Sequence, residues 1–404
     1  MFKAGALRHR NFRILWIATL LSSTARWADL VVVGWLTLEL TDSPLMVGIV
    51  TGCKMAGYLL APMMGVLADR MDRRKLLIMA SLISGGVTLT MLTLLLTDSL
   101  IISHLIILSL ISSLTWALDH PTRQAFIPDL VGKDDLTNAV AMNAVATEMT
   151  VVIGPAFGGL LIPAFGMSGA YALIALIYFL DLGALLRLKN AKYPIEQAPP
   201  RKHEPPLKSL VAGFHYAWSQ QTVFVLLLIA FMLNFFVAPY RYSFLPLFSR
   251  YVLDVGPTGY GMLTATAGLG ALTAGLFVVS LGNFKRRGLF VVTGGLLWPA
   301  TLFMFSLSDS YYLSLGIVFF AGLAQAITWT LIATLILSNT APEMRGRVMG
   351  LRTGVVISLP FGNLVAGGIA ESFGVQLALG AYGVCAAALM MLIILRVPAL
   401  RKLQ

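Results

Sequence analysis

Long runs of apolar residues, separated by short polar and basic segments, make up most of the chain. A helix that crosses about 30 Å of hydrocarbon needs about 20 predominantly apolar residues. Five runs meet that length without any charged residue, at 76–97, 255–284, 289–308, 311–341 and 372–395. Runs that carry one or two charges bring the predicted membrane spans to twelve, at 12–40, 44–68, 76–97, 100–119, 138–165, 168–188, 222–248, 259–281, 289–308, 311–338, 351–373 and 376–396. The pattern therefore predicts an all-α membrane protein.

The positions of lysine and arginine orient these spans. Most of the 29 Lys and Arg residues flank the first and last spans or lie in every second loop, whereas only Arg250 falls in a loop of the opposite side. Because cytoplasmic loops carry the excess of positive charge, both termini are predicted to be cytoplasmic. The first span is too long, and too polar in its middle, for a cleaved signal peptide. The expected location is the plasma membrane of a bacterium.

A polar segment divides the predicted spans into six and six. Residues 187–208 contain several prolines and charges, which is typical of a linker. An amphipathic helix on the inner leaflet is predicted to follow, since five apolar residues then share one helical face: Leu207, Leu210, Val211, Phe214 and Trp218. The predicted organisation is therefore a six-helix bundle at 1–188, a linker at 189–220 and a second six-helix bundle at 221–404.

Short segments at corresponding positions of the two halves of the chain are similar in sequence. The basic turn DRMDRRK at 69–75 corresponds to GNFKRRG at 282–288, and GPAFGG at 154–159 corresponds loosely to GNLVAGG at 362–368. Repeated six-span halves are typical of secondary transporters whose site lies between the halves and opens alternately to each side. We therefore expect two pseudo-symmetric bundles and alternating access.

The composition excludes several classes of protein. With 58% apolar and 12% charged residues, the chain has too few charges for a soluble enzyme, in which about 25% is usual. The net charge of +11 comes from basic residues between apolar runs, which indicates a membrane surface and not a nucleic acid. Cys53 and Cys385 show no metal-ligand spacing, and no phosphate-binding glycine loop is present. We expect no enzymatic activity, no metal and no cofactor, with the proton gradient as the energy source.

The segments between the spans resemble those of a known family. GVLADRMDRRK at 65–75 looks like the loop signature of the major facilitator superfamily between its second and third spans. DHPTRQAFIPDLV at 119–131 and MRGRVM at 344–349 are similar to a branch that exports drugs, macrolides and siderophores and is transmembrane secretion effector-like. The resemblance covers essentially the whole chain. It implies a secondary transporter with the major facilitator fold, and export as its direction.

Two interpretations of the 65–75 segment stay open. In the first, the basic residues only anchor the topology on the anionic inner surface, at about 1 kcal/mol each. The resemblance implies instead a conformational latch that stabilises the outward-open state. In that latch Asp69 meets the amino end of span eleven, where helix N–H groups favour an anion, and Arg70 or Arg74 pairs with an acid near span four. The candidate latch residues are Gly65, Asp69, Arg70, Arg73, Arg74, Asp119, Arg123 and Asp129.

Span five contains a group of helix-bending and small residues, Gly154, Pro155, Gly158 and Gly159. Proline frees a backbone carbonyl, and glycine removes side-chain bulk, so that the helix can bend and pack tightly. A tight helix contact explains this group. The group also resembles the closing part of the antiporter motif of exporters, although the upstream glycines of that motif are missing.

Charged residues inside the spans are the strongest functional candidates, because each costs about 2.5–3.5 kcal/mol on insertion scales. The cations are Arg26, Lys54 and Arg241, and the anions are Asp29, Glu148 and Asp181. One interpretation is a static ion cluster that holds spans one and two together. The other is proton coupling, since the proton affinity of a buried carboxylate changes when its cationic partner moves. Asp29 ranks first as the carrier, followed by Glu148 and Asp181, with Arg26 and Lys54 as partners.

Polar and aromatic residues at mid-membrane depth are the candidates for the substrate cavity: Trp27, Tyr58, Asn234, Tyr240, Arg241, Gln325, Trp329 and Asn363. Aromatic rings suit amphiphilic or cationic compounds. The leading hypothesis is a monomeric, proton-coupled exporter of small amphiphilic compounds, with membrane lipids around it. The alternatives are a lipid or lysolipid translocator and a non-transporting sensor built on a transporter fold.

Overall fold

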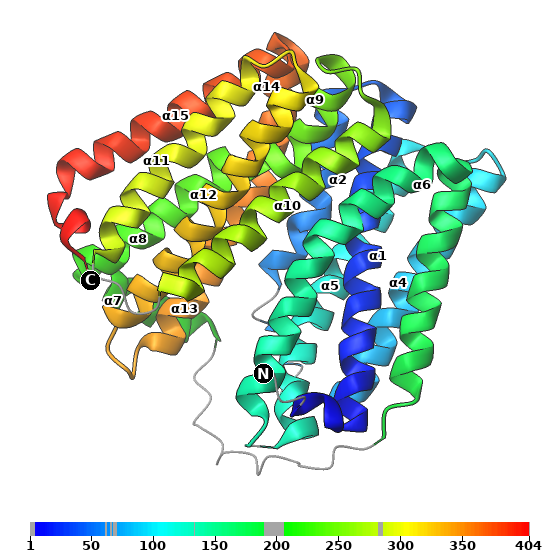
Figure 1. Cartoon of the computed structure of the whole chain (residues 1–404), viewed down its shortest axis with the longest axis horizontal. Coiled ribbons are helices and arrows are strands. Elements are labelled where there is room, and N and C mark those ends of the chain that lie inside the picture. Colours follow the sequence, from blue (N-terminus) through cyan, green and yellow to red (C-terminus); the bar gives the residue numbers. More distant parts are fainter. Residues whose placement is uncertain are drawn as a thin grey trace. The chain divides into compact units, whose positions relative to one another are not determined.

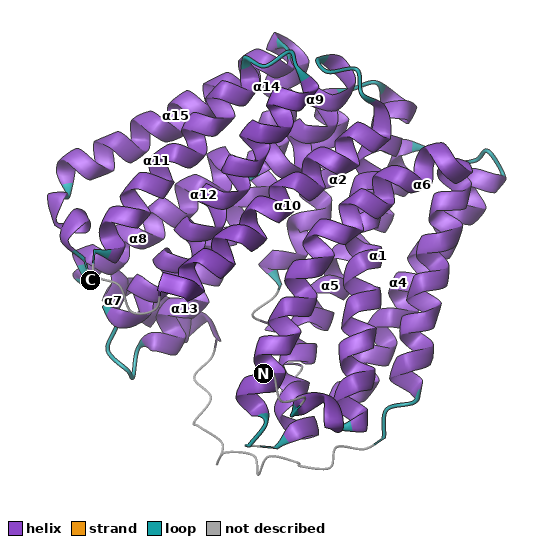
Figure 2. Cartoon of the chain, viewed as in Figure 1, coloured by secondary structure: helices purple, strands orange, loops and turns teal. Residues whose placement is uncertain are grey.

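The computed structural model describes residues 5–60, 63–64, 67, 71–132, 134–189, 206–281 and 286–403. Within these residues every regular element is a helix and no strand occurs (Figures 1 and 2). Ten helices are long and apolar enough to cross a membrane, and a shorter apolar segment spans Pro44–Leu59. The all-α membrane class predicted from the sequence is confirmed.

In the described residues, the first half of the chain forms two short 3-10 turns and five α-helices. They are η1 (Ala6–Arg8), α1 (Arg10–Thr41), α2 (Pro44–Met55) with the 3-10 turn η2 (Ala56–Leu59), α4 (Arg73–Leu96), α5 (Ile102–Val131) and α6 (Leu136–Leu186). Asp72 starts α4, because its side chain accepts hydrogen bonds from the backbone N–H groups of Arg74 (2.9 Å) and Lys75 (3.2 Å). The basic segment predicted as a loop signature thus also contains a helix N-cap.

Helix α6 is two membrane spans in one continuous element. It has 51 residues, which at 1.5 Å of rise per residue corresponds to about 77 Å, far more than the hydrocarbon thickness. The break falls at Gly166, whose φ of 69° and ψ of 178° are not helical and lie in a region that favours glycine. With α6 counted as two spans, and with Pro44–Leu59 included, the helices account for the twelve predicted spans.

The second half contains a distorted first span followed by regular helices. The elements are α7 (Pro206–Ser219), α8 (Gln221–Met232), η3 (Leu233–Val237), η4 (Tyr240–Phe244), α9 (Leu245–Tyr251), α10 (Gly256–Leu281), α11 (Arg287–Ser306), α12 (Tyr311–Ser338), α13 (Arg345–Gly354), η5 (Val355–Ile357), α14 (Ser358–Phe373), α15 (Val375–Arg396) and η6 (Pro398–Lys402). Both η3 and η4 are π-helical turns. Because π-turns are rare and frequently mark functional sites, they point to the middle of this span.

Contacts group the chain into two compact units. The N-terminal unit comprises Met1–Val33 and Ala56–His203, and the C-terminal unit comprises Gly34–Met55 and Glu204–Gln404. The predicted first bundle includes Gly34–Met55, whereas the contacts assign this segment to the C-terminal unit, in which α2 packs on α14. A Cβ atom on Gly48 would lie 2.5 Å from the carbonyl oxygen of Asn363. Glycine is therefore required where these two helices approach.

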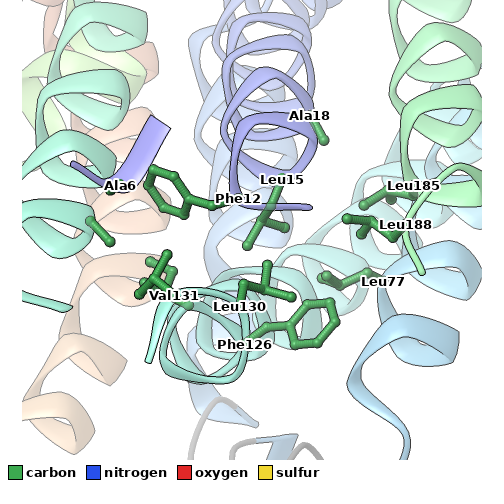
Figure 3. Close-up of a cluster of buried hydrophobic side chains, with 12 residues drawn as sticks. Ala6, Phe12, Leu15, Ala18, Leu77, Phe126, Leu130, Val131, Leu185 and Leu188 are labelled. Atoms are coloured by element: carbon green, nitrogen blue, oxygen red, sulfur yellow. The ribbon is translucent and has the colours of Figure 1, made fainter. Parts of the chain in front are cut away.

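A cluster of buried apolar side chains holds one end of the N-terminal unit together (Figure 3). It brings together Phe12 and Leu15 of α1, Leu77 of α4, Phe126 of α5 and Leu185 of α6. Lipid tails are as apolar as these side chains, so close packing rather than removal from water is what stabilises the association of membrane helices.

Helix α5 is longer than predicted. The sequence suggested a span ending near residue 119, but the helix continues through Pro121 and Pro128 to Val131. Proline is tolerated inside membrane helices where neighbouring groups satisfy the freed backbone. Asp119, Arg123 and Asp129, expected near a loop, therefore lie on a helix.

The predicted amphipathic helix after the linker is α7. Val211, Phe214 and Trp218 are exposed, at 49%, 51% and 66%. Helix α7 packs on α13 through Gly213, where a Cβ atom would lie 3.1 Å from the Arg347 carbonyl oxygen. An exposed apolar face beside a packed one is what an interfacial helix needs.

Candidate functional site

Arg123 is the centre of a buried ion cluster in the N-terminal unit. Its Nε donates to both carboxylate oxygens of Asp119, one turn earlier on α5, at 2.9 and 2.8 Å. Its Nη2 donates to Asp181 of α6 at 3.2 and 3.3 Å. The side chains of Arg123 and Asp181 are 5% and 0% exposed. Charges this deeply buried persist only when paired and hydrogen-bonded.

A second arginine lies in the same cluster and makes a different contact. Arg26 of α1 is positioned over the indole ring of Trp116, with 5.3 Å between the guanidinium carbon and the ring centroid. Trp116 in turn stacks on His120 at 5.7 Å and meets Tyr58 edge-on at 4.1 Å. Cation–π contacts of this geometry stabilise a desolvated guanidinium by about 2 kcal/mol.

Between these groups lies a polar cavity of about 20 Å³. A site of about 10–15 Å³ is sufficient to hold one water molecule when two or more polar partners line it. The cavity is lined by Ser22, Arg26, Ala80, Ser81, Ser84, Ser112, Thr115, Trp116, Asp119, Tyr178 and Asp181. It connects the acid of α5, the acid of α6 and the arginine of α1 through a hydroxyl-rich wall.

Asp29 is buried on α1, at 6% exposure, and acts electrostatically on Tyr171 and Tyr178 of α6. Close contact between α1 and α6 makes this possible: a Cβ atom on Gly158 would lie 2.7 Å from the Ala28 carbonyl oxygen. Gly154 faces Trp27 in the same way. The glycines of span five therefore serve a tight helix contact, and that contact brings Asp29 next to α6.

The structure also describes the two other predicted coupling residues. Glu148 is on an exposed face of α6, together with Val145 and Met149. Lys54 is half-buried at the end of α2, in the segment grouped with the C-terminal unit.

The acid near span four is paired with another arginine than the two predicted. Asp129 of α5 pairs with Arg73, whereas Arg74, one of the two predicted partners, donates to the Leu186 carbonyl at the end of α6, at 2.9 Å. These contacts tie the start of α4 to α5 and α6. Gly65, Asp69 and Arg70 lie outside the described residues.

Two residues expected in the latch have a different place. Asp119 and Arg123 were predicted near a cytoplasmic loop, but Arg123 is 4% exposed inside α5 and both residues belong to the buried cluster with Asp181. The predicted span ended at residue 119, whereas the helix continues to Val131, because membrane helices accommodate proline.

The predicted cavity residues of the second half gather around the π-turns. Tyr240 of η4 meets Trp298 of α11 at 6.4 Å between ring centroids, and Trp298 meets Trp329 of α12 at 6.2 Å. The Tyr240 hydroxyl lies 3.5 Å from Oε1 of Gln325. Arg241, beside Tyr240, is 5% exposed. Asn234 has a local role, since its amide donates to the Ala230 carbonyl of its own helix.

Asn363 joins a buried polar chain that also includes α2. The Ser243 hydroxyl of η4 donates to Asn363 Oδ1 at 2.8 Å and lies 2.9 Å from the Thr51 hydroxyl. All three residues are fully buried. This chain fixes α2, η4 and α14 to one another within the C-terminal unit.

Three aromatic residues of these clusters were not among the predicted site residues: Trp116, His120 and Trp298. Trp116, Asp119, His120 and Arg123 stand at positions i, i+3, i+4 and i+7, so that all four fall on one side of α5. That spacing was a usable signal, obscured because the span was expected to end at residue 119. Trp298 had no such signal, because a tryptophan in an apolar span is as often lipid-facing.

Comparison with solved structures defines the class of protein. The chain is similar to the nucleoside transporter NupG (TM-score 0.76, 12% identity, 98% of this chain and 100% of that one). It is also similar to a bacterial homolog of the human lysosomal transporter Spinster (TM-score 0.75, 16% identity, 99% of each chain). At these identities the likeness shows the fold alone. The protein has the major facilitator fold, an all-α membrane fold.

The sequence comparison gives the family. A family model described as transmembrane secretion effector matches residues 3–404, and the chain belongs to that family. It is similar to the enterobactin exporter EntS of Escherichia coli O1:K1 / APEC and of Shigella boydii serotype 18. Each is 29% identical over 322 residues, which cover 79% of this chain and 72% of the relative. The resemblance to exporters drawn from the loop motifs is thus confirmed.

Proposed function

We propose that the protein is a proton-coupled exporter, an antiporter that moves small amphiphilic compounds out of the cell by alternating access. The observation that carries the proposal is the set of ionisable groups inside membrane helices, with Asp29 buried and Arg123 between two aspartates. Each such group is costly in a membrane and is by default functional. A scaffold or sensor without a carrier role has no need of them.

The proposed cargo class is a siderophore, a macrolide or a similar drug-like compound. The relatives named enterobactin exporters support a siderophore first. We further propose that the protein works as a monomer in the plasma membrane of a bacterium with both termini cytoplasmic. The proton gradient is then its energy source, without a bound cofactor.

Asp29 is the proposed proton carrier. Asp119 and Asp181 both accept hydrogen bonds from Arg123, which holds both acids in one cluster. Asp29 lies on α1, next to the tight contact with α6, and a change in that contact changes its surroundings. A carboxylate whose environment changes between two states exchanges a proton between them.

Reconstituted protein with a pH-sensitive dye inside the vesicles tests the proposal. Adding enterobactin or a macrolide is expected to start proton flux through the wild type, and Asp29→Asn is expected to abolish this flux while cargo binding persists. Asp98→Asn, the same change on an exposed turn between α4 and α5, is the matched control. Cargo that crosses without proton movement contradicts proton coupling. Wild-type flux in Asp29→Asn excludes Asp29 as the carrier.

A second candidate, lipid or lysolipid translocation, is favoured by an apolar pocket in the C-terminal unit. This pocket of about 340 Å³ lies between α11 and α12. Its lining includes Leu297, Met304 and Phe320, whose side chains are more than half exposed. An acyl chain suits such a surface better than a polar cargo does. Transfer of a fluorescent lysolipid between vesicle leaflets, compared with protein-free vesicles, tests this candidate.

A further inference from the structure

We infer that the groove between α11 and α12 binds one acyl chain of an anionic phospholipid, whose headgroup lies at the arginines where α11 begins. The lipid is a bound partner of the C-terminal unit and not cargo, so the inference does not depend on the proposed export. It also differs from the lipid translocation considered above, because the bound lipid stays in one leaflet.

The groove runs along two helices that pack against each other (Figure 1). Helix α12 contributes a stripe of lining residues that includes Phe320. On α11 the lining residues recur every three or four positions and so share one face: Phe290, Gly294, Leu297, Thr301 and Met304. Between the first and the last of these, α11 rises about 21 Å, which is more than the about 15 Å of hydrocarbon in one leaflet. The groove is therefore long enough for one acyl chain.

Residue size explains why a groove forms here. Gly294 and Ala324 are small and buried between the two helices, and a Cβ atom on Gly294 would lie 2.5 Å from the Thr328 hydroxyl oxygen. Leu297 and Phe320, which also line the groove, are large and more than half exposed. Small residues between the helices and large residues on their outer faces leave a depression between α11 and α12.

The wall of the groove is apolar although it contains two threonines. The Thr301 hydroxyl donates to the Trp298 carbonyl at 2.6 Å. The Thr293 hydroxyl donates to the Phe290 carbonyl at 3.3 Å, so both hydroxyls are engaged within α11. The volume of about 340 Å³ lies within the roughly 300–1,000 Å³ of ligand sites. An empty space of this size loses dispersion contacts, and hydrocarbon holds no water to fill it. A lipid acyl chain is the apolar molecule available there.

The start of α11 supplies positive charge next to the groove. Arg286 is exposed and directly precedes the helix, and Arg287 is its first residue. Arg287 stands three positions before Phe290 and so lies on the face that lines the groove. Side chains on a helix lean towards its N-terminus, which directs this guanidinium away from the hydrocarbon and towards the headgroups.

The C-terminal turn η6 brings a third arginine to the same end of α11. The Gly288 N–H donates to the Leu403 carbonyl at 3.0 Å, which places the exposed Arg401 of η6 beside the first turn of α11. Helices α11, α12 and α15 and the turn η6 contain no Asp or Glu. The charge of this end is therefore positive, and an anionic headgroup is attracted to it.

Native mass spectrometry of the full-length protein tests the inference with two phospholipids that have the same acyl chains, phosphatidylglycerol and phosphatidylcholine. Each arginine near a membrane surface contributes about fivefold in affinity for an anionic lipid. With three arginines, the wild type is expected to retain one phosphatidylglycerol molecule and to prefer it about 100-fold. Arg287→Gln is expected to lower the preference about fivefold, and Arg286→Gln/Arg287→Gln about 25-fold.

Arg250→Gln is the control for charge, because it removes an arginine of the same unit that pairs with Asp42 at 3.3 Å. Its preference should equal that of the wild type. A wild-type preference below about fivefold, or a wild-type preference in Arg286→Gln/Arg287→Gln, overturns the headgroup site. Glycerol 3-phosphate has the headgroup chemistry without the chains and should leave the bound lipid in place. Displacement by an equal concentration of it overturns the role of the groove.

Leu297→Trp tests the groove itself, because the indole occupies the space of the acyl chain. The affinity for both phospholipids is expected to fall about tenfold. Leu313→Trp is the matched control, since Leu313 of α12 is also 58% exposed but does not line the groove. Equal affinities in the two variants overturn the acyl-chain site. If Leu297→Trp does not fold, Met304→Trp, at another exposed lining residue, replaces it against the same control.

The outcome is separable from that of the proposed function. A wild type that couples cargo to protons but retains no phosphatidylglycerol overturns the lipid site alone. A wild type that retains the lipid with the expected preference, yet shows no cargo-driven proton flux, supports the lipid site and overturns proton coupling.

Discussion

Arg123 of α5 reaches Asp181 of α6 at 3.2 Å, and the Asp181 side chain is completely buried. This pair joins two spans that the sequence separates by 58 positions. The N-terminal ion cluster is therefore a structural tie, that is, a contact that holds α5 and α6 together, as well as a candidate site for proton exchange.

Replacing Asp181 by alanine is expected to destabilise the N-terminal unit by about 3–5 kcal/mol, because Arg123 would keep a buried charge with only one carboxylate. Equilibrium unfolding in mixed detergent micelles measures this. Glu343→Ala, at an exposed turn before α13, should change stability little. A loss below about 1 kcal/mol for Asp181→Ala would show that the pair is not a structural tie.

Gly158→Ala is expected to destabilise the protein by about 1–3 kcal/mol, since the added methyl group would meet the Ala28 backbone at 2.7 Å. Gly183→Ala is the control on the same helix, because a Cβ atom there meets nothing within 4 Å. That substitution should be neutral or stabilise by up to about 1 kcal/mol through helix propensity. Thermal unfolding of both variants measures these changes in stability. Equal changes in the two variants would contradict the close contact of α1 and α6.

Ser243→Ala is expected to cost about 1–3 kcal/mol, because Asn363 Oδ1 would lose its donor in a buried site. Ser249→Ala is the matched control: Ser249 is equally buried, but its hydroxyl donates to the Leu245 carbonyl of its own helix at 2.8 Å. The double variant Ser243→Ala/Asn363→Leu should recover part of the loss. Equal stability of the two single variants would mean that the polar chain between α2 and α14 contributes nothing.

Asp135 provides a pH-dependent anchor for the N-terminal segment, outside the membrane helices. A hydrogen bond with His9, at 2.8 Å, and further hydrogen bonds from Arg8 hold the pKa of this carboxyl below its ordinary value of 3.8. The folded-state pKa is the lower one, so the contribution to stability is complete above pH 3.8 and is lost as the pH falls through the folded value.

Hydrogen exchange of residues 5–13 measures this anchor. Asp135→Asn is expected to raise exchange there at neutral pH and to remove the additional rise that the wild type shows on acidification below about pH 4. Asp134→Asn is the neighbouring control. Identical exchange in wild type and Asp135→Asn would show that the carboxylate does not hold the segment.

Many features of the fold could be predicted from the sequence, because a membrane restricts which residues and which secondary structures can lie in it. Uncharged runs such as 289–308 and 311–338 predict α11 and α12 closely. Backbone groups left without hydrogen bonds in hydrocarbon are costly, so only helices and closed barrels cross a membrane. The loop motifs were sufficient to place the chain in its superfamily. The sequence also identified candidate functional residues whose type alone marks them, such as an aspartate or an arginine in an apolar run.

The residues that each charged side chain contacts could not be predicted from the sequence in the same way. Span limits at α5 were wrong because Pro121 weakens a helix in water but is tolerated among packed membrane helices. The sequence identified Arg26 as a charged residue inside a span, but it did not indicate that the guanidinium lies over Trp116 of another helix. Sequence spacing gives neighbours on one helix, whereas interhelical neighbours depend on rotation and depth.

The sequence by itself determined that the chain crosses a membrane many times, where its charges interrupt the hydrocarbon spans and which family it belongs to, because burial in lipid selects residue types directly. Only the tertiary structure decided that Arg123 joins Asp119 to Asp181, that Arg26 lies over Trp116 beside a polar cavity, and that Gly34–Met55 packs with the C-terminal helices. Those relationships depend on how the helices pack side by side. Close contacts at residues such as Gly48 and Gly158 determine this packing, and composition does not encode it.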